Sequence, residues 1–475
     1  MEYAKPLAAH RTAIDGLLLF DVPVHGDNRG WFKENWQREK MLAAGLADFG
    51  PVQNNISFNA ATGTTRGIHA EPWDKYISVA TGTVFGAWVD LREGPGFGTL
   101  VTAELDPATA VFVPAGVGNA FQTLADGTAY TYLVNAHWSP DAAYSFLNLA
   151  DPTVNVPWPI PLAHAELSEK DKNHPFLADV TPVRGKKTLV LGAGGQLGRA
   201  LADAYDGDPR VEFAPRRTLD LAGPDAFDAI DWTGYDTVIN AAAYTSVDAA
   251  ETPAGRAAAW AVNATAVAAL ARACTAHRIT LVHLSSDYVF DGTVPVHGED
   301  EPLSPLGVYG QAKAAGDTAA ATVPRHYLVR TSWVIGDGNN FVKTMAGLAA
   351  RGIRPAVVND QHGRLTFATD LAHGIRHLLD ANAPYGTYNL TNDGPAQTWA
   401  DIAADVYELL GHPRTSVTGT STAEYFAGKP DTAPRPRHST LDLAKITATG
   451  FAPPPAARRL AEYLDSLNHN AGTGA

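Results

Sequence analysis

A tyrosine and a lysine stand four residues apart at Tyr309 and Lys313, in a stretch with helical character. Residues at i and i+4 lie on one face of a helix, and an ammonium group beside a phenol favours proton transfer near neutral pH. Ser286 ends a preceding apolar strand, at the edge where parallel sheets place their ligands. A Tyr-x-x-x-Lys pair alone is usually a plain helix surface, but this combination indicates carbonyl–alcohol redox chemistry.

A glycine-rich turn, Gly192-Ala193-Gly194-Gly195-Gln196-Leu197-Gly198, follows a short apolar strand and opens a helix. Small residues let backbone N–H groups approach a pyrophosphate, although tight turns also need glycine. The place of the turn after the first strand favours a dinucleotide site. Arg216 and Arg217 follow the next strand, ahead of Asp220 and Leu221. Basic residues there suit the 2′-phosphate of NADPH; a solvated turn is the alternative interpretation, and NADH is the alternative coenzyme.

The N-terminal half carries a second set of reactive residue types. His69 lies in Arg66-Gly67-Ile68-His69, with Lys75, Tyr132 and Asp151 downstream. An imidazole base, a carboxylate, a cation and a phenol suffice to remove a proton beside a ketone and to return one. Spacing alone does not assemble that set, and a hydrogen-bonded core histidine is the better interpretation of His69 taken by itself.

The elements that must position these residues differ between the two halves. Residues 1–160 carry short β-branched and aromatic runs between turn residues, a pattern typical of an all-β sandwich or barrel. From residue 187, strands alternate with helices, which indicates an α/β fold around a parallel sheet. Residues 161–186, rich in proline and charge, are predicted to be a linker, and 469–475 a frayed tail.

The composition excludes several functions. The net charge of −14 opposes binding to nucleic acid or to an anionic membrane. The single cysteine, Cys274, excludes an intramolecular disulfide and a CxxC metal site, and buried filler is its expected role. The apolar stretch 257–273 is broken by Asn263 and Arg272, which argues against a membrane span. We expect a cytoplasmic protein with no metal site.

The C-terminal half resembles the dTDP-4-dehydrorhamnose reductases, within the extended short-chain dehydrogenase/reductases, over residues 186–465. The motifs that carry the resemblance are the glycine turn, Asn240-Ala241-Ala242-Ala243-Tyr244, Ser285-Ser286-Asp287-Tyr288, Tyr309 with Lys313, Arg330-Thr331-Ser332-Trp333, Asn339-Asn340-Phe341 and Arg435-Pro436-Arg437. The resemblance implies a Rossmann fold with a smaller substrate-binding subdomain. It implies that Tyr309 protonates the C4 oxygen, that Ser286 binds this oxygen, and that Lys313 lowers the tyrosine pKa and holds the ribose. It also adds Ala241, Ala242 and Ala243 to the coenzyme site, and Asp287, Trp333, Asn340 and Arg435 to the substrate site.

Residues 20–160 are similar to the dTDP-4-dehydrorhamnose 3,5-epimerases. The matching segments include Asp27-Asn28-Arg29-Gly30, Gln53-Asn54-Asn55, Arg66-Gly67-Ile68-His69, Val89-Asp90-Leu91-Arg92 and Asp151-Pro152. This resemblance implies a cupin-like jelly roll without a catalytic metal. It makes His69 the base, Asp151 the carboxylate that orients it, Tyr132 the acid and Lys75 the cation at O4. It assigns Arg29, Gln53, Asn55 and Arg66 to the nucleotide and pyrophosphate, and Glu34 to the thymine. Asn119 stands where the family usually has histidine, so this position donates a hydrogen bond without carrying a positive charge.

Together the two halves predict a multidomain bifunctional enzyme, with an epimerase at 1–160 and an NAD(P)-binding reductase at 187–468. The product of the first reaction is the substrate of the second, so dTDP-4-dehydro-6-deoxyglucose becomes dTDP-L-rhamnose. We expect a homodimer. One alternative is an active reductase that carries a noncatalytic or single-carbon epimerase-like module. The other is a regulatory interaction protein with a reductase fold, against which the retained Ser286, Tyr309 and Lys313 argue.

Overall fold

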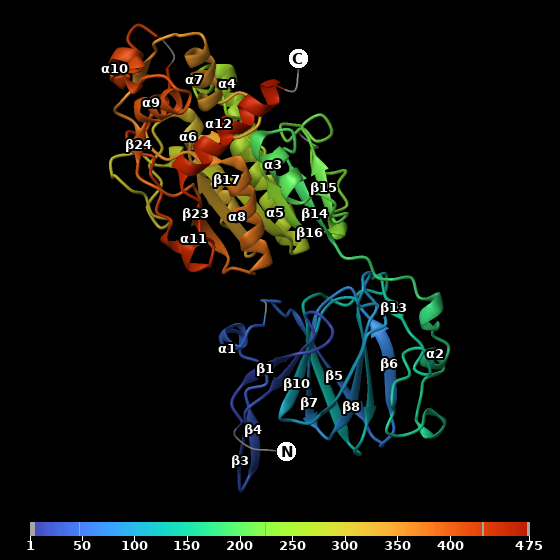
Figure 1. Cartoon of the computed structure of the whole chain (residues 1–475). Helices are drawn as coiled ribbons and strands as arrows, with labels where there is room; N and C mark the ends of the chain where they lie inside the picture. The colour runs from blue at the N-terminus through green and yellow to red at the C-terminus, as the bar shows by residue number, and fades with distance from the viewer. Residues whose placement is uncertain (1–4, 47, 224, 430–431, 473–475) are drawn as a thin grey trace. The chain divides into compact units, whose positions relative to one another are not determined.

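The computed structural model describes residues 5–46, 48–223, 225–429 and 432–472, and the chain forms two compact units, 1–185 and 186–475 (Figure 1). Each unit has its own hydrophobic core. The change in sequence pattern between the two halves therefore corresponds to a change of architecture.

The first unit is a sandwich of two antiparallel sheets with the strand orders β1-β2-β10-β7-β12-β5 and β13-β6-β11-β8-β9. The strands are β1 Ala8–Arg11, β2 Leu18–Asp21, β5 Gln53–Asn59, β6 Thr65–Ala70, β7 Lys75–Thr81, β8 Val84–Asp90, β9 Leu100–Leu105, β10 Thr109–Val113, β11 Val117–Thr123, β12 Thr128–Val134 and β13 Ser145–Phe146. Side chains such as Trp88, Val111 and Tyr130 fill the space between the sheets, because alternate residues of a strand face the same side. The all-β jelly-roll prediction is confirmed.

Two smaller elements stand beside the sandwich. The hairpin of β3 (Val24–Asp27) and β4 (Gly30–Lys33) pairs only with itself among the described strands. Helix α1 spans Arg38–Ala43, and its buried residue Met41 packs with Phe49 and Tyr76.

The predicted linker proves to be part of the first unit up to residue 185. It contains the one-turn helix α2 (Glu169–Lys172) and the short turns η1 (Leu162–His164) and η2 (Leu177–Asp179). Backbone bridges join Glu166 to Thr64 and Val183 to Arg92. Proline and charged residues in this segment therefore mark an irregular layer that packs on the sandwich, and the boundary at residue 160 was placed too early.

The second unit is built on a parallel six-stranded sheet with the order β15-β14-β16-β17-β18-β23. The strands are β14 Lys187–Leu191, β15 Val211–Ala214, β16 Tyr235–Asn240, β17 Thr280–Ser286, β18 His326–Thr331 and β23 Gly386–Asn389. Strand β14 lies between β15 and β16, so the chain passes from β14 to the strand on one side and then crosses to the strand on the other side. Such a topological switch point leaves a crevice at the carboxyl ends of the strands. The predicted Rossmann architecture is confirmed.

Helices cover both faces of this sheet (Figure 1). Helices α3 (Gln196–Ala204) and α8 (Ala368–Asp380) pack on one face, and α5 (Ala266–His277) and α6 (Val308–Ala320) on the other. The continuous run Pro253–His277, which includes α4 (Pro253–Trp260), is long and apolar enough to cross a membrane by length and composition. In the structure, Val267, Leu270 and Cys274 of this run are buried against the sheet, so the apolar residues of the run belong to the hydrophobic core. Cys274 is buried and unpaired, as predicted.

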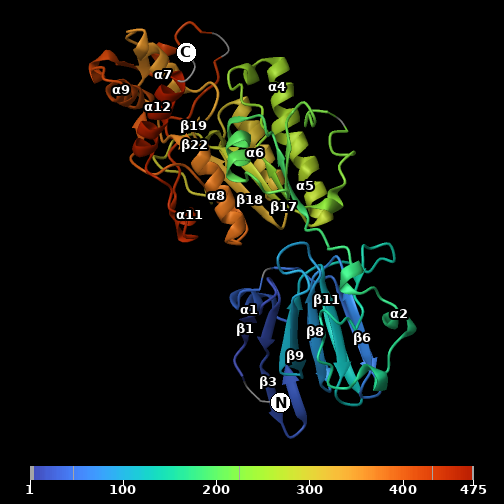
Figure 2. The same cartoon turned by 45° about the vertical axis from the view of Figure 1, so that its right-hand side comes forward.

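A smaller subdomain gathers beyond one end of the parallel sheet, where Figure 2 shows α7, α9 and α12 together. Its helices are α7 Phe341–Ala350, α9 Trp399–Leu409, α10 Thr422–Tyr425 and α12 Ala456–Gly472, whereas α11 Ala444–Ala448 packs on the core of the parallel sheet beside β23. Short strand pairs complete it: β19 Val334–Ile335 with β22 Thr366–Phe367, β20 Ala356–Val358 with β25 Thr418–Thr420, and β21 His362–Gly363 with β24 Gln397–Thr398. Helix α12 includes 469–472 of the predicted tail, and 473–475 lie outside the described residues.

Candidate active sites

The second unit holds a cavity of about 880 Å³ at the carboxyl ends of its central strands. Its lining includes the predicted residues Gly192, Gly194, Gly195, Gln196, Leu197, Arg216, Asp220, Leu221, Ala241, Ala242, Ala243, Ser286, Asp287, Tyr309, Lys313 and Trp333. Arg217 is exposed and is not among the lining residues. The structure thus brings nearly all predicted coenzyme residues together with the reactive serine, tyrosine and lysine.

The glycines of the turn are required by close backbone approach. Gly192 has a φ of +77°, and a Cβ there would come within 2.6 Å of the Ala242 nitrogen. A Cβ on Gly198 would lie 2.4 Å from the Gly192 oxygen, so α3 could not pack as closely on the turn. Gly195 is the N-cap of α3 and carries no side chain to cover the first N–H groups of the helix. These N–H groups can therefore donate hydrogen bonds to an anionic ligand, as predicted from the glycine-rich turn.

The reactive residues of this cavity are ordered by hydrogen bonds. Ser286 Oγ donates to Asp287 Oδ1 over 2.8 Å and accepts from the Tyr288 N–H over 3.2 Å. Lys313 Nζ donates to the Leu284 carbonyl over 2.6 Å. Tyr309 is buried, and burial raises the pKa of its phenol against a smaller opposing effect of the Ser286 hydroxyl. The expected lowering of this pKa by Lys313 stays a prediction, because the desolvation of Tyr309 is the largest effect on its pKa in the structure.

Lys313 itself is held in a buried charge network. Burial lowers the pKa of Lys313 to about 8, and the charge of Asp317, one helical turn later, acts in the opposite direction. Asp317 is buried and accepts from Arg330 Nε over 3.3 Å. On the neighbouring strand, burial and the charge of Lys313 lower the pKa of His283 well below its ordinary value, so this histidine is neutral.

We expect the rate of the reductase to fall as pH rises through about 8, because Lys313 then loses its proton. Asp317→Asn should move this alkaline limb to lower pH, because the carboxylate raises the pKa of Lys313. The measurement is kcat/KM for NADPH oxidation between pH 6 and pH 10. Asp300→Asn, at an exposed carboxylate, is the matched control and should leave the profile unchanged. An unshifted limb in Asp317→Asn would contradict the role of this pair.

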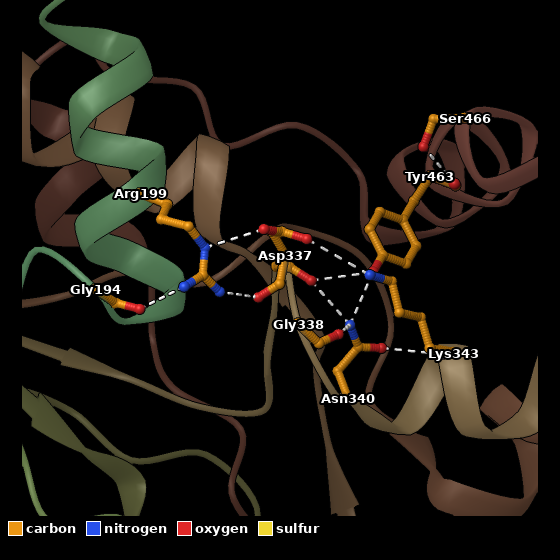
Figure 3. A network of polar contacts seen from close by, with 9 residues as sticks. Gly194, Arg199, Asp337, Gly338, Asn340, Lys343, Tyr463 and Ser466 are labelled. Carbon is orange, nitrogen blue, oxygen red and sulfur yellow. Dashed lines mark hydrogen bonds and ion pairs between the residues drawn. The ribbon is translucent and has the colours of Figure 1, made fainter. Parts of the chain in front are cut away.

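Arg199 connects the glycine turn to the substrate-binding subdomain (Figure 3). Its guanidinium donates to the carbonyls of Gly194 and Asp337, and its Nε lies 3.0 Å from Asp337 Oδ2. Lys343 Nζ, on α7, lies 3.6 Å from the other oxygen of the same carboxylate. A single arginine therefore fixes the loop after β19 against the turn expected to hold the coenzyme.

Asn340 was predicted to bind substrate, but the structure gives it a structural role. Its Oδ1 accepts from the Lys343 N–H over 2.9 Å, so it is the N-cap of α7. Its Nδ2 donates to Tyr463 of α12 over 2.8 Å and to the Gly336 carbonyl over 2.9 Å (Figure 3). All polar atoms of the side chain are thereby engaged within the protein, and the neighbouring Asn339 lines the cavity instead.

Two further residues that were predicted to bind substrate are Trp333 and Arg435. Trp333 lines the cavity and stacks on Trp399, with ring centroids 3.7 Å apart. Arg435 forms a two-pronged ion pair with Asp248, each bond 2.8 Å long, and lies over the Phe426 ring. Arg435 is not among the residues that line the cavity, so its predicted contact with substrate stays a prediction.

In the first unit, the reactive residues come from different strands of the sandwich. His69 is on β6, opposite Asn119 of β11. Lys75 is on β7, and its Nζ lies 5.7 Å from the centroid of the Tyr132 ring on β12. Burial lowers the pKa of Lys75 to about 7 and raises that of Tyr132. The buried ammonium group forms an ion pair with Glu71, a residue that no motif in the sequence marks.

The carboxylate that pairs with His69 is Asp171 and not Asp151. His69 Nε2 lies 3.0 Å from Asp171 Oδ1. Asp151 instead accepts from three backbone N–H groups, those of Thr153, Val154 and Leu177, at 2.9, 2.8 and 2.6 Å. The predicted role of Asp151 was therefore wrong, because its oxygens are used to hold the turns that follow the last strand.

Asp171 was missed because it lies in the segment interpreted as a linker. A local signal marks a helix there: Ser168 caps α2 by accepting from the Asp171 N–H over 3.1 Å. Burial acts to raise the pKa of Asp171, but the bond and charge of His69, the Gly67 N–H and the charge of His174 lower it below its ordinary value. The carboxylate is therefore ionised at neutral pH and can orient the imidazole.

Asn119 is held in a fixed orientation by two donors. Its Oδ1 accepts from Trp88 Nε1 over 2.9 Å and from the Tyr130 hydroxyl over 3.1 Å. Because an indole N–H can only donate, the atom that faces it must be the amide oxygen. The Nδ2 group of Asn119 is thus the one available to a ligand, which agrees with the donor role expected of it.

The His69 cluster is the group formed by His69, Lys75, Asn119, Tyr132 and Asp171. The side chains of the remaining residues predicted to bind the nucleotide have their hydrogen-bond or ion-pair partners outside this group. Gln53 and Asn55 are hydrogen-bonded to each other on β5 over 2.9 Å, and Arg66 donates to Asn59 over 3.0 Å. Arg29 pairs with Asp27 in the β3–β4 hairpin, and Glu34 pairs with Lys40 of α1. In the described part of the chain these last two residues contact no member of the His69 cluster, so their predicted contact with a nucleotide stays a prediction.

The two units define two classes of catalytic domain. The first is a jelly roll with a histidine–carboxylate pair, a buried lysine and a tyrosine. The second is a nucleotide-binding oxidoreductase of the short-chain type, with serine, tyrosine and lysine on one cavity.

Comparison with known proteins agrees with this division. Residues 186–469 match the family model described as RmlD substrate binding domain, and residues 11–179 match dTDP-4-dehydrorhamnose 3,5-epimerase. The chain is 53% identical to the protein RmlC homolog of Streptococcus pyogenes over 39% of this chain and 96% of that protein. It is 37% identical to the dTDP-4-dehydrorhamnose reductase of Aggregatibacter actinomycetemcomitans over 56% of this chain and 94% of that protein.

A solved structure supports the fold of the second unit. The dTDP-4-dehydrorhamnose reductase from Bacillus anthracis, in complex with NADP, is 30% identical and superimposes with a TM-score of 0.54, covering 59% of this chain and 98% of that one. The chain therefore belongs to the dTDP-4-dehydrorhamnose 3,5-epimerase family through its first unit and to the dTDP-4-dehydrorhamnose reductase family through its second.

Proposed function

We propose that this protein is a bifunctional enzyme that epimerises dTDP-4-dehydro-6-deoxyglucose at C3 and C5 and then reduces the C4 ketone to give dTDP-L-rhamnose. The observation that carries the proposal is that each unit assembles a complete reactive set on its own fold. The pair of His69 and Asp171 lies in the first unit, and Ser286, Tyr309 and Lys313 line one cavity in the second. The relatives of each unit support the same two activities.

In the first reaction, His69 removes the proton from the carbon beside the ketone, and Asp171 stabilises the imidazolium that forms. Negative charge then develops on O4, where the ammonium group of Lys75 opposes it. Tyr132 returns a proton to the opposite face of the ring. Burial raises the pKa of Tyr132 and so keeps its phenol protonated, which is the form that a donor needs.

The second reaction requires a nicotinamide coenzyme, which supplies the hydride for C4 when it is bound. The second unit fits such a dinucleotide, because a Cβ at Gly192 or Gly198 would fill the close contacts of the turn and because Arg216 lines the same cavity. Tyr309 donates a proton to the C4 oxygen while Ser286 holds that oxygen. The raised pKa of Tyr309 suits this direction of reaction, because the donor must begin protonated.

The coenzyme is NADPH, and Arg216 is the residue proposed to recognise its 2′-phosphate. Arg216→Ala should raise the KM for NADPH by about 10- to 100-fold, the equivalent of one charge-assisted hydrogen bond, and leave the KM for NADH nearly unchanged. Arg217→Ala is the matched control, because Arg217 is exposed and does not line the cavity. Equal effects of Arg216→Ala on both coenzymes would show that this arginine does not read the phosphate.

We further propose that the protein is a homodimer in the cytoplasm. Strand β5 is an edge strand, and its residues Ile56 and Phe58 are 69% and 64% exposed. Exposed apolar side chains on a sheet edge favour association with a second copy. Light scattering of the purified full chain should give twice the mass of 50.3 kDa, and a monomer mass at micromolar concentration would contradict the dimer. The reduced, buried Cys274 is consistent with a cytoplasmic location.

The decisive experiment is NMR of the product formed from purified protein, dTDP-4-dehydro-6-deoxyglucose and NADPH in deuterated water. The proposal predicts an L-rhamnose configuration with deuterium at both C3 and C5. Deuterium at one carbon only would indicate a single-carbon epimerase. Reduction without any label would make the first unit a noncatalytic module, and no oxidation of NADPH would contradict the reductase.

A further inference from the structure

His174 is a buried histidine for which the proposed reactions have no use. It follows α2, and its side chain is only 5% exposed. Neither ring nitrogen makes a hydrogen bond within the described residues, although the Leu147 carbonyl lies near enough to act on the pKa of the ring. Buried polar groups normally have a partner, which makes this residue an exception that needs an explanation.

The unpartnered ring lies beside the reactive pair of the first unit. His174 Nε2 is 3.8 Å from Asp171 Oδ1, and His69 Nε2 is 3.0 Å from the same oxygen. The two imidazole nitrogens and the carboxylate oxygen all lie within 4.8 Å of one another. Ligand atoms around a tetrahedral zinc ion, bound at about 2.0–2.2 Å, are separated by about 3.4 Å. Small side-chain rotations would therefore place all three atoms around one ion.

The surroundings hold both rings in place and leave one side open. Phe146 stacks on His174 with ring centroids 4.7 Å apart, and His69 meets His174 edge to face at 5.3 Å. The side chain of His69 is 33% exposed, whereas those of Asp171 and His174 are 7% and 5% exposed, so an ion reaches the site from solvent past His69. One charge that would repel a cation here is that of Lys170, whose Nζ lies over Phe146 at 4.9 Å from the ring centroid.

We propose that His69, Asp171 and His174 form a binding site for a divalent transition-metal ion of the zinc type, and that occupation of this site blocks epimerisation. Two imidazoles and one carboxylate suit zinc, cobalt or nickel, whereas magnesium and calcium prefer oxygen ligands. The ion binds His69 Nε2 in place of the proton that Asp171 holds there. The neutral imidazole then carries its proton on Nδ1 and has no lone pair left to remove the substrate proton, so the metal acts as an inhibitor. The proposed inhibition of epimerisation rests on the proposed epimerase function, whereas the proposed binding of the metal ion does not.

The inhibition is tested with the full chain, free of any histidine tag, by titration with zinc chloride. Exchange of deuterium into the keto sugar should fall at least 10-fold at saturating zinc and return after addition of EDTA. NADPH oxidation with an already epimerised keto sugar should change less than twofold. Inhibition of both activities to the same extent, or of neither, would overturn the proposal.

His174→Phe keeps a ring that can stack on Phe146 but removes the ligand atom. In zinc-free buffer this variant should retain exchange within about threefold of the wild type, and its half-inhibiting zinc concentration should rise at least 10-fold. His164→Phe is the matched control, because His164 is exposed in the same segment, and its zinc sensitivity should equal that of the wild type. His174→Leu serves as a second variant if His174→Phe does not fold.

Cobalt(II) gives a readout that is independent of activity. Wild-type protein should develop the visible d–d absorption of low-coordinate cobalt, and His174→Phe should lose it, whereas His164→Phe should keep it. Equal spectra in the wild type and His174→Phe would refute the site even if epimerisation is normal. A cobalt spectrum in a protein that catalyses no exchange would instead support the site and contradict the proposed epimerase.

Discussion

Replacing Tyr309 by phenylalanine should lower NADPH oxidation by about 10²–10⁴-fold, the range that a positioned general acid contributes. Tyr309 is the phenol beside Ser286 in the large cavity, and burial keeps it protonated and ready to donate. Phenylalanine preserves the ring and its packing with Val308 and Ala312, so the loss should appear in kcat with little change in stability. The measurement is steady-state oxidation of NADPH with epimerised keto sugar.

Two controls separate the chemistry of Tyr309 from its packing. Tyr288 lines the same cavity and meets Tyr309 edge to face at 5.4 Å, so Tyr288→Phe should cost far less activity if Tyr309 is the donor. Deuterium exchange by the first unit of the Tyr309→Phe chain should stay within twofold of the wild type. A Tyr309→Phe enzyme with wild-type turnover would exclude this phenol as the proton donor.

His69→Ala should reduce deuterium exchange into the keto sugar by about 10²–10⁴-fold, because no other group in the described cluster combines an accessible lone pair with a paired carboxylate. Asp171→Asn should also reduce exchange strongly, since an amide neither fixes the imidazole tautomer nor stabilises the imidazolium. The reductase rate of the same chains, measured with epimerised substrate, should be unchanged. Exchange that survives in His69→Ala would exclude this histidine as the base.

Asp151→Asn is the informative comparison for Asp171→Asn. Asp151 accepts from three backbone N–H groups, so its replacement should lower the free energy of unfolding of the first unit by about 1–3 kcal/mol. Exchange per folded molecule should remain close to that of the wild type. The opposite outcome, with full exchange in Asp171→Asn and loss in Asp151→Asn, would restore the role that the sequence resemblance gave to Asp151.

The architecture of both units could be predicted because its signals are local. The glycine turn after an apolar strand, the alternation of strands with helices and the helical spacing of Tyr309 and Lys313 each involve residues within about 20 positions. The strands of the sandwich followed from short β-branched and aromatic runs between turn residues. Local backbone geometry and burial of one face determine such features.

The errors concern partners that are distant in sequence or roles that depend on burial. Asp171 lies 102 residues after His69, and no periodicity connects the two. The spacing of Tyr309 and Lys313 does not indicate that Tyr309 is buried, and this burial, which depends on the whole fold, raises the pKa of its phenol. Asn340 could have been recognised as an N-cap, since it directly precedes the apolar helix that begins at Phe341.

The extent of the first unit has a practical consequence for anyone who wishes to express the two activities separately. A gene fragment that ends at residue 160 encodes the whole double-sheet scaffold and His69, yet it discards Asp171, the carboxylate that pairs with this imidazole. Binding of a sugar nucleotide to such a truncated polypeptide would therefore not report on its catalytic turnover. A cut near Gly185 follows the boundary between the two units and keeps Asp171 on the same fragment as His69, and the second fragment then begins just before the first strand of the parallel sheet.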